Sequence, residues 1–474
     1  MQILSAVRRL DLDFFPDIDL IITIVYHKSG RKSVQFLEVH VRNRDQLIEI
    51  INEYIETLPP AQTKRGVVIE PIRGKASILI GVRRSGKSTI MAGEIRALLS
   101  QAVRQSHILY LNFFDDRLRG LDLAGLDTLF ETYREMRPEI AAKDRIYCFF
   151  DEIQSIEGWE SFVERLIRRE NCDVWLTGSS AAMLSKEIAT QMRGRALSWE
   201  VFPFSFQEFL THRQVAFAGP ISVTTRRKIN QCFDDYWQTG GFPEVLDLQQ
   251  HMRVMVHQEY LRTILFRDLI ERHEIGHPKA LMDMTHQLIE NVASQHSINS
   301  LSKYLKTLGH KIQKSTVSQY LDWLEDAYFL YGVRIFDASV TRTEINPRKI
   351  YCADHALVKS ISLGILENSG HLLENLVYIT LRRKNEKVFY YRTATGLEVD
   401  FVTVEAGRKR RLIQVAENLM SPKTRERELK ALVAAMREQK IKDGTIVTRA
   451  EDENIETDAG AVQVISIAKF LLAN

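Results

Sequence analysis

Short apolar runs alternate with helically spaced apolar positions over residues 70–205. The runs lie at 76–80, 107–112, 145–150 and 172–177, and each is bounded by polar residues. Strands that are apolar throughout and alternate with helices indicate a parallel sheet that helices cover on both faces. We therefore expect an α/β fold in this part of the chain.

The pattern differs on either side of this core. Residues 17–41 alternate apolar and polar positions around Lys28-Ser-Gly30, which predicts a β-hairpin, and a helix is expected over Asn43–Thr57 before Pro59-Pro60 breaks the chain. Residues 206–290 have mostly helical spacing. The last hundred residues predict mixed α/β structure, with helices at 370–384 and 423–439 and strands near 387–392, 397–404 and 411–416.

These changes of pattern divide the chain into five expected parts. They are an accessory hairpin and helix (1–60), the α/β core (61–210), a helical lid or linker (211–290), a helical segment that ends in a hairpin (291–355) and a C-terminal α/β domain (356–474). A chain of 474 residues is long enough for several domains, since single cores stop growing well below this length.

Composition narrows the class of protein. The chain is 45% hydrophobic and 26% charged, and its net charge is 64 − 61 = +3, as in ordinary globular proteins. No apolar run is long enough to span a bilayer, and no long apolar stretch marks a signal peptide. The four cysteines are scattered without a C-x-x-C pair, which favours buried free thiols in a reducing, cytoplasmic compartment over a metal site.

The segment Gly81–Thr89 carries the clearest chemistry. Its sequence, Gly-Val-Arg-Arg-Ser-Gly-Lys-Ser-Thr, matches the phosphate-loop pattern G-x-x-x-x-G-K-[ST] between an expected strand and an expected helix. Backbone N–H groups and the helix N-terminus then favour phosphate, so the sequence predicts a site for ATP. Lys87 is expected to reach the β- and γ-phosphates, and Ser88 to hold Mg²⁺. The other expected nucleotide contacts are Gly81, Arg83, Arg84, Ser85, Gly86 and Thr89.

Two acidic residues follow a later apolar run. Ile146-Tyr-Cys-Phe-Phe150 leads into Asp151-Glu152, which is the Walker B pattern downstream of a phosphate loop. Hydrolysis of the γ-phosphate needs a metal ligand and a group that orients water. We expect Asp151 to hold Mg²⁺ and Glu152 to position the attacking water.

Further polar groups follow the next expected strand. Ser179 or Ser180 after Thr177 is a candidate to contact the γ-phosphate, and either serine is equally suited to cap the helix that follows. Arg193 or Arg195 is a candidate arginine finger, because a guanidinium stabilises phosphoryl charge. A finger acting on a neighbouring subunit implies a homo-oligomeric ring, for example a hexamer.

The chain resembles prokaryotic AAA-type ATPases that combine a P-loop domain, a winged-helix segment and a C-terminal nuclease-like fold. The resemblance covers about residues 70–450 and leaves out 1–60. It rests on Gly81–Ser88, Phe150–Gln154, Leu176–Ser180, Arg193–Ala196, Pro203–Phe209, Thr239–Pro243 and Gly396–Phe401, in that order. It implies an α/β P-loop domain that hydrolyses ATP with Mg²⁺.

The segment 291–355 suggests a winged helix. Its second helix begins near Lys314, and Lys303, Lys306, Lys311 and Lys314 form a basic cluster suited to DNA phosphates. Residues 281–350 nevertheless hold eight Lys or Arg against seven Asp or Glu, so the segment as a whole attracts DNA only weakly. DNA contact and a purely structural role therefore both stay open.

The C-terminal region resembles the restriction-endonuclease-like fold. That resemblance implies an acidic residue on a helix, met by Glu374, an Asp on a strand, met by Asp400, and a Glu-x-Lys on the next strand. Gln414 and Ala416 stand where the Glu and Lys belong, although Glu417 or Lys423 could substitute for them. We expect this domain to have lost nuclease activity while it still contacts DNA or a protein partner.

The sequence thus predicts an oligomeric ATPase with two alternative tasks. In the first, it is a motor or remodeller that acts on DNA. In the second, ATP operates a switch that captures or releases a protein partner in defence or regulation, and its turnover is indifferent to DNA.

Overall fold

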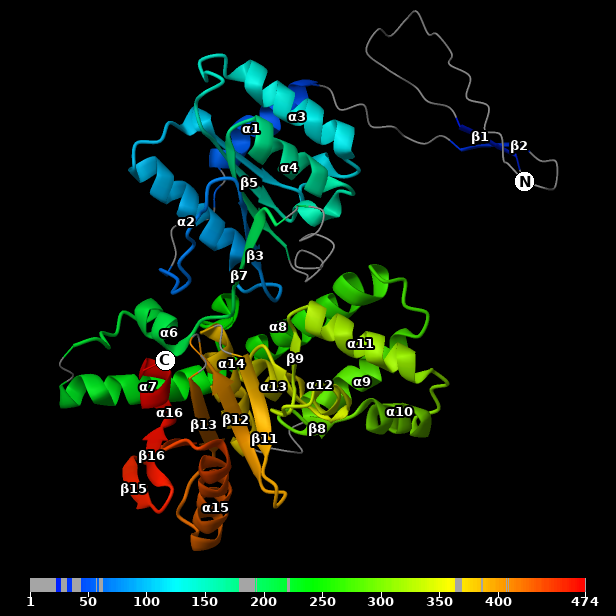
Figure 1. Ribbon diagram of the computed structural model, residues 1–474. Coiled ribbons are helices and arrows are strands. Elements are labelled where there is room, and N and C mark those ends of the chain that lie inside the picture. The colour runs from blue at the N-terminus through cyan, green and yellow to red at the C-terminus, as the bar shows by residue number, and fades with distance from the viewer. Residues whose placement is uncertain are drawn as a thin grey trace, which may run out of the picture. The chain divides into compact units, whose positions relative to one another are not determined.

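The computed structural model describes most of the chain. The described residues are 23–26, 32–35, 44–56, 58, 63–178, 192, 194–219, 222–362, 369–384, 387–405, 407 and 409–473. They form two compact units, one from Met1–Leu58 and Ala102–Val174 and the other from Pro59–Gln101 and Trp175–Asn474 (Figure 1).

A five-stranded sheet has the order β4-β5-β6-β3-β7. Its strands are β3 (Ala76–Ile80), β4 (Ile108–Asn112), β5 (Ile146–Asp151), β6 (Cys172–Thr177) and β7 (Ala196–Glu200). β4 and β5 are parallel, and β3 is parallel to both β6 and β7. The parallel α/β class is therefore confirmed. The apolar runs predicted all strands except β7, which is half-exposed along its length and so lacks such a run.

The first unit contains β4, β5 and three helices. They are α1 (Arg44–Glu56), α3 (Leu123–Met136) and α4 (Trp159–Arg169), joined with the short helices η1 (Gln105–His107), η2 (Asp116–Leu118) and η3 (Ile153–Ser155). α1 packs against β4 and α3 and buries Leu47, Ile50, Ile51 and Tyr54. The Tyr54 hydroxyl lies 2.7 Å from Asp115 Oδ2 and 3.1 Å from the carbonyl oxygen of Asn112. The helical part of segment 1–60 thus shares a core with the α/β domain, although the sequence suggested a separate accessory unit. The predicted hairpin is present as β1 (Thr23–Tyr26) and β2 (Lys32–Gln35).

The second unit begins with β3 and α2 (Lys87–Ser100) and continues, after β7, through helices. These are α6 (Phe206–His212), α7 (Val223–Thr239), η5 (Pro243–Val245), α8 (Gln250–Thr263), the π-helix η6 (Ile264–Glu271) and α9 (Pro278–Glu290). Three further helices and the strands of a small sheet follow in the order β8 (Gln295–His296), α10 (Ile298–Thr307), α11 (Lys314–Asp326), β9 (Leu330–Val333), α12 (Val340–Ile345) and β10 (Arg348–Cys352). The strands are antiparallel in the order β8-β10-β9.

The C-terminal part is a six-stranded mixed sheet with helices. α13 (His355–Ile361) and α14 (Ser369–Arg383) lead into the order β11-β12-β13-β14-β16-β15. The strands are β11 (Lys387–Arg392), β12 (Glu398–Val404), β13 (Arg410–Val415), β14 (Asp443–Thr448), β15 (Glu453–Thr457) and β16 (Gly460–Ser466).

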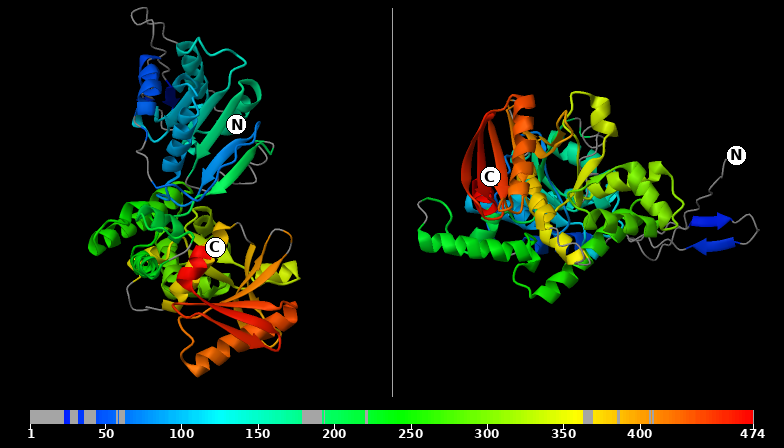
Figure 2. Two further views of the ribbon diagram at one scale, coloured as in Figure 1. Left: turned by 90° about the vertical axis from the view of Figure 1, so that its left-hand side faces the viewer. Right: turned by 90° about the horizontal axis from the view of Figure 1, so that it is seen from below.

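Three helices pack on this sheet. α15 (Pro422–Gln439) lies along β12, β13 and β14, where Leu432 and Met436 share a core with Leu412 and Ile446 (Figure 2). α14 contacts β11, β12 and β13, and α16 (Ile467–Ala473) contacts β14 and β16. Helix α14 therefore brings its polar residues next to the middle of the sheet.

The free cysteines Cys148, Cys172 and Cys352 are buried, and Cys232 is partly exposed. Over the described ranges, no three His, Cys, Asp or Glu side chains are arranged to hold a metal ion. No helix in these ranges is both long and apolar enough to cross a membrane.

Candidate nucleotide site

The phosphate loop joins β3 to α2 and has the backbone shape that its glycines predict. Gly81 and Gly86 have φ values of 137° and 96°, in the region that side chains disfavour. A Cβ atom at Gly81 would lie 2.2 Å from the carbonyl oxygen of Val201, so the loop needs glycine at this position. Helix α2 begins at Lys87 without a side-chain cap, which leaves its first N–H groups for an anion.

Two side chains inside the loop suit a phosphate ligand. Lys87 is buried, and its Nζ donates to the carbonyl oxygens of Gly81 and Val82 at 2.9 and 3.1 Å. The Ser85 hydroxyl is also buried, and within the described parts of the chain it has no hydrogen-bond partner. An orphaned hydroxyl and uncapped N–H groups are donors that phosphate oxygens would satisfy. The residues present therefore fit the β- and γ-phosphates of a nucleotide.

The two loop arginines contact acids from the helical segment that follows. Arg83 forms two hydrogen bonds to the Asp268 carboxylate, at 2.6 and 3.1 Å. Arg84 lies 3.4 Å from Glu244, and the Tyr260 hydroxyl donates to the same carboxylate at 2.7 Å. Asp268 is buried in the π-helix η6, a kind of helix that often marks a functional site. Both arginines, which the sequence predicted as nucleotide contacts, are thus ion-paired in this state.

Arg65 connects the phosphate loop to neighbouring parts of the chain. Its guanidinium donates to the carbonyl oxygens of Ser85 and Phe202 at 2.8 and 2.6 Å and to Glu208 Oε1 at 2.9 Å, and it lies over the Phe204 ring. Burial acts to raise the pKa of Glu208, but the charges of Arg65 and Arg383 outweigh it and hold this pKa below its ordinary value. Arg65 thereby ties the phosphate loop to helix α6.

The acidic pair lies at the end of β5 in the first unit, where Asp151 is the last residue of the strand. Asp151 is 2% exposed, its carbonyl oxygen accepts from Phe113 N–H, and Tyr110 Oη lies 3.4 Å from its carboxylate. Glu152 has a φ of 60°, in the left-handed region, and its carboxylate accepts a hydrogen bond from the Gln154 amide. A non-glycine residue in this region stores backbone strain, which is often found where a side chain has a functional direction.

The other residues that the sequence predicted for the nucleotide site lie outside the described residues or are partly exposed. Ser179, Ser180 and Arg193 lie outside the described residues. Arg195 precedes β7 and is partly exposed, and its backbone carbonyl accepts a hydrogen bond from Ala76 N–H. Ser88 and Thr89 are the second and third residues of α2 and are partly exposed.

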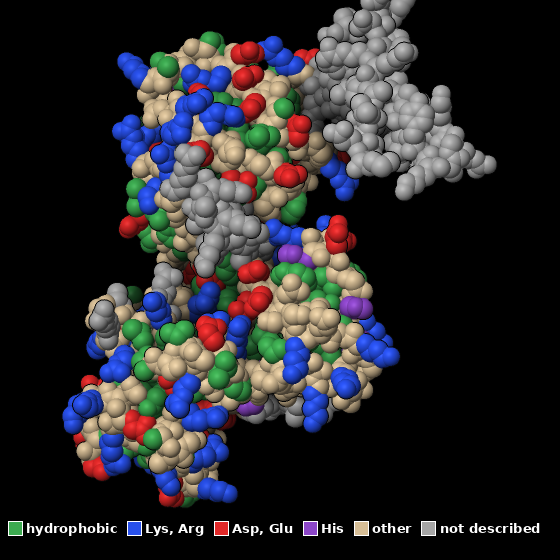
Figure 3. Space-filling view, turned by 45° about the vertical axis from the view of Figure 1, so that its right-hand side comes forward, with side chains coloured by type: hydrophobic (Ala, Val, Ile, Leu, Met, Phe, Trp, Pro, Cys, Tyr) green, Lys and Arg blue, Asp and Glu red, His purple; other side chains and the backbone are tan. Residues whose placement is uncertain are grey.

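The basic cluster predicted for DNA lies on α10 and α11 and between them. Lys303, Lys306, Lys311 and Lys314 are all exposed. Figure 3 shows Lys and Arg side chains gathered over this part of the surface. The sequence predicted helices followed by a hairpin here; in the structure β8 precedes α10 and α11, and the short helix α12 separates the antiparallel strands β9 and β10.

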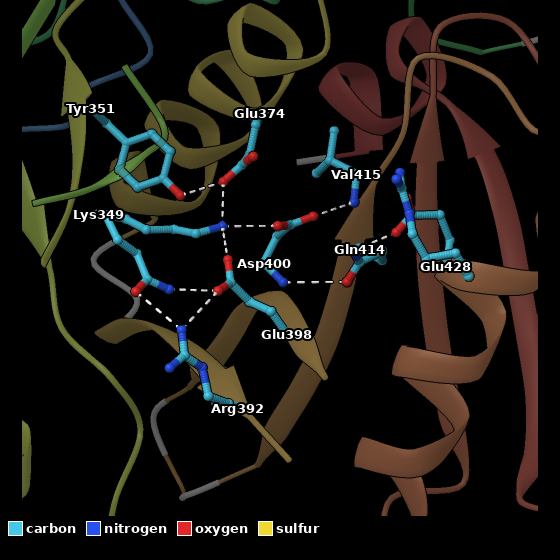
Figure 4. Close-up of polar contacts among 11 residues, drawn as sticks. Lys349, Tyr351, Glu374, Arg392, Glu398, Asp400, Gln414, Val415 and Glu428 are labelled. Atoms are coloured by element: carbon cyan, nitrogen blue, oxygen red, sulfur yellow. Dashed lines mark hydrogen bonds and ion pairs between the residues drawn. The ribbon is translucent and has the colours of Figure 1, made fainter. Parts of the chain in front are cut away.

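The C-terminal candidates come together in one cluster. Glu374 on α14 and Asp400 on β12 both contact Lys349 of β10, and Gln414 on β13 donates to Glu428 at 2.7 Å (Figure 4). The sequence reasoning missed Lys349, as it missed Arg65, Asp268 and Glu244. Lys349 is flanked by Arg348 and Ile350 and belongs to no motif. The sequence therefore held no pattern that could have found it.

The chain matches models of three protein families. The model of the AAA domain matches residues 73–210, and two domains of unknown function, DUF8612 and DUF4143, match residues 230–369 and 369–470. The uncharacterized protein MJ1544 of Methanocaldococcus jannaschii is 32% identical over 86% of this chain and 90% of its own length. An uncharacterized protein of Haemophilus influenzae is 28% identical over 69% of this chain and 79% of its own length.

Solved structures are more distant. The Walker-type ATPase PABY2304 of Pyrococcus abyssi has a TM-score of 0.40 and 16% identity, and covers 67% of this chain and 95% of its own. The family assignment therefore rests on the sequence matches and on the parallel sheet with its phosphate loop. The chain belongs to the prokaryotic AAA-type ATPases.

Proposed function

We propose that the protein hydrolyses ATP with Mg²⁺ as an oligomer and uses the energy to act on DNA. The observation that carries the nucleotide part is the phosphate loop itself, whose uncapped helix N-terminus, buried Ser85 hydroxyl and buried Lys87 ammonium provide donors for phosphate oxygens. Lys87 would hold the β- and γ-phosphates, and Ser88 and Asp151 would hold Mg²⁺. The metal would stabilise the charge that develops on the transferring phosphoryl group.

Glu152 is the proposed group that orients the attacking water, and Ser179 is a further candidate for the γ-phosphate. Arg193 or Arg195 is proposed to reach the nucleotide of a neighbouring subunit in a ring such as a hexamer. The substitution Glu152→Gln tests the first role. The glutamine amide has nearly the shape of the glutamate carboxylate, but it cannot accept a proton from the attacking water. We expect ATP to stay bound and turnover to fall by about a hundredfold or more. Glu157→Gln is the matched control, since Glu157 is an exposed carboxylate five residues further along the same segment. Unchanged turnover in Glu152→Gln contradicts the proposed role.

The DNA part rests on the exposed lysines of α10 and α11. Each lost phosphate contact lowers the slope of log affinity against log salt by about 0.9 for duplex DNA. The variant Lys311→Glu/Lys314→Glu should therefore bind DNA more weakly and with a shallower salt slope. Lys143→Glu/Lys228→Glu changes the charge equally on exposed lysines that lie outside α10, α11 and the C-terminal domain, and is the control for this segment. Equal effects of the two double variants would show that the winged-helix-like segment is not the contact.

A second function is a nucleotide-operated switch for a protein partner. The ion pairs of Arg83 with Asp268 and of Arg84 with Glu244 favour it, because incoming phosphates would compete with these carboxylates for the same guanidinium groups. ATPase rates with single-stranded, duplex and branched DNA separate the two functions. Stimulation that weakens as salt rises supports the motor, and a slow rate that no DNA changes supports the switch.

A further inference from the structure

A buried lysine lies at the centre of the carboxylates in the C-terminal domain. Lys349 of β10 is 3% exposed, and lysine is almost never buried to this extent unless it is paired. Its Nζ lies 2.9 Å from Glu374 Oε1, 2.9 Å from Asp400 Oδ1 and 2.8 Å from Glu398 Oε1. An ammonium has three N–H donors, so these three carboxylates use its whole donor capacity (Figure 4).

The surrounding contacts hold each carboxylate in place. Tyr351 lies two residues after Lys349 on the same face of β10, and its hydroxyl donates to Glu374 Oε1 at 2.6 Å. Asp400 Oδ2 accepts from Val415 N–H at 2.9 Å, and Arg392 lies 3.6 Å from Glu398. The carboxylates thus converge on one point from α14 and β12, and the lysine reaches that point from another sheet.

The charges explain why the lysine stays protonated. Burial acts to lower the pKa of Lys349, but Asp400, Glu374 and Glu398 outweigh it and hold this pKa well above its ordinary value. Burial, with the nearby charge of Asp400, raises the pKa of Glu374 above its ordinary value, and the charge of Lys349 opposes this rise. One cation therefore balances carboxylates that would otherwise repel one another in a region of low polarity.

We propose that the Lys349 ammonium is the resident cation of this cluster and occupies the position between Glu374 and Asp400 that a divalent cation would need. Mg²⁺ binds oxygens at about 2.0–2.1 Å and keeps several waters, so it has no place beside an ammonium that already contacts the same oxygens. The domain then gains a fixed internal ion pair where catalysis would need an exchangeable metal. The ion pairs of the lysine also connect β10 of the three-stranded sheet to α14 and to β12 of the six-stranded sheet.

An adjoining cavity makes the proposal testable. A cavity of about 670 Å³ is lined by Glu374, Glu398, Asp400, Gln414 and Glu417, so ions have space to reach these carboxylates. Removal of the ammonium should leave them without a cation and open to Mn²⁺. Stability and metal binding in the absence of nucleotide do not depend on the proposed function.

The experiment compares the full-length protein with Lys349→Met, which keeps most of the side-chain stem and removes the charge. We expect the Tm of Lys349→Met to fall by about 10 °C without metal, because buried carboxylates are left uncompensated. Millimolar Mn²⁺ should restore most of that loss, and calorimetry should detect one more Mn²⁺ per chain than in the wild type. Lys430→Ala, which removes an exposed lysine of α15, should match the wild type in both measurements.

A second variant keeps the test decisive if Lys349→Met folds poorly. In Lys349→Met/Glu374→Gln one carboxylate is neutral, so the Tm should rise above that of the single variant, and the response to Mn²⁺ should weaken. The proposal is overturned if Lys349→Met binds no additional Mn²⁺ and its Tm is the same with and without the metal. It is also overturned if neither Mn²⁺ nor Glu374→Gln restores folded protein.

Discussion

The substitution Arg65→Met removes the guanidinium that connects the phosphate loop to helix α6. The side chains of Arg65 and Glu208 are 9% and 8% exposed, so solvent screens this pair little. The change deletes the hydrogen bonds to Glu208, Ser85 and Phe202 while methionine keeps an apolar stem of similar length. Glu208 is then left as a buried carboxylate that has lost its main countercharge.

The loss of stability in Arg65→Met depends on the contacts that Glu208 keeps. Removal of one partner from a buried ion pair costs about 3–5 kcal/mol. Glu208 keeps hydrogen bonds from Gly66 and Ser205 N–H at 2.6 and 2.7 Å, and Arg383 lies 3.9 Å away. These remaining donors place the expected loss near the lower end, about 3 kcal/mol, which raises the unfolding equilibrium constant by a factor of about a hundred.

Urea denaturation followed by circular dichroism measures this loss as a lower midpoint at an unchanged slope. Arg73→Met is the matched control, because Arg73 is exposed on the same segment, and it should change the midpoint little. The double variant Arg65→Met/Glu208→Gln should recover part of the loss, since the uncompensated charge is gone. ATP binding should weaken in Arg65→Met, because the carbonyl of Ser85 loses its donor. A loss below about 1 kcal/mol, or strictly additive effects of the two substitutions, would refute the reasoning.

Three further predictions follow from single contacts. Gly81→Ala should abolish ATP binding, because its Cβ would lie 2.2 Å from the carbonyl oxygen of Val201; binding of a fluorescent ATP analogue measures this, and normal affinity would contradict it. Burial lowers the pKa of His257 from 6.5 to about 4, so the unfolded chain takes up a proton before the folded chain does as the pH falls. The free energy of unfolding should therefore drop by about 3 kcal/mol between these two pH values. In urea titrations, His257→Gln should flatten this pH dependence. Tyr54→Phe should lower the free energy of unfolding by about 1–2 kcal/mol, because its hydroxyl donates a partly buried hydrogen bond to Asp115, and an unchanged midpoint would show that the contact contributes nothing.

The sequence predicted those elements that a few neighbouring residues encode. The strands β3 to β6 and the helix α2 were predicted because an apolar run or a helical period lies within a few residues of the chain. β7 was missed because its side chains are half-exposed and show no such run. The π-helix η6 was missed as well, since its residues have ordinary helical spacing in the sequence.

The sequence by itself determined the family, the phosphate loop with Lys87, and the acidic pair at the end of β5, because each of these is encoded by neighbouring residues whose chemistry needs that order. Only the tertiary structure revealed the partners that act across long stretches of chain. Arg65 meets Glu208 across 143 positions, Arg83 meets Asp268 across 185, and Lys349 meets Asp400 across 51. A charged residue becomes informative in these cases only through burial and a countercharge, and both properties come from packing that no local pattern records.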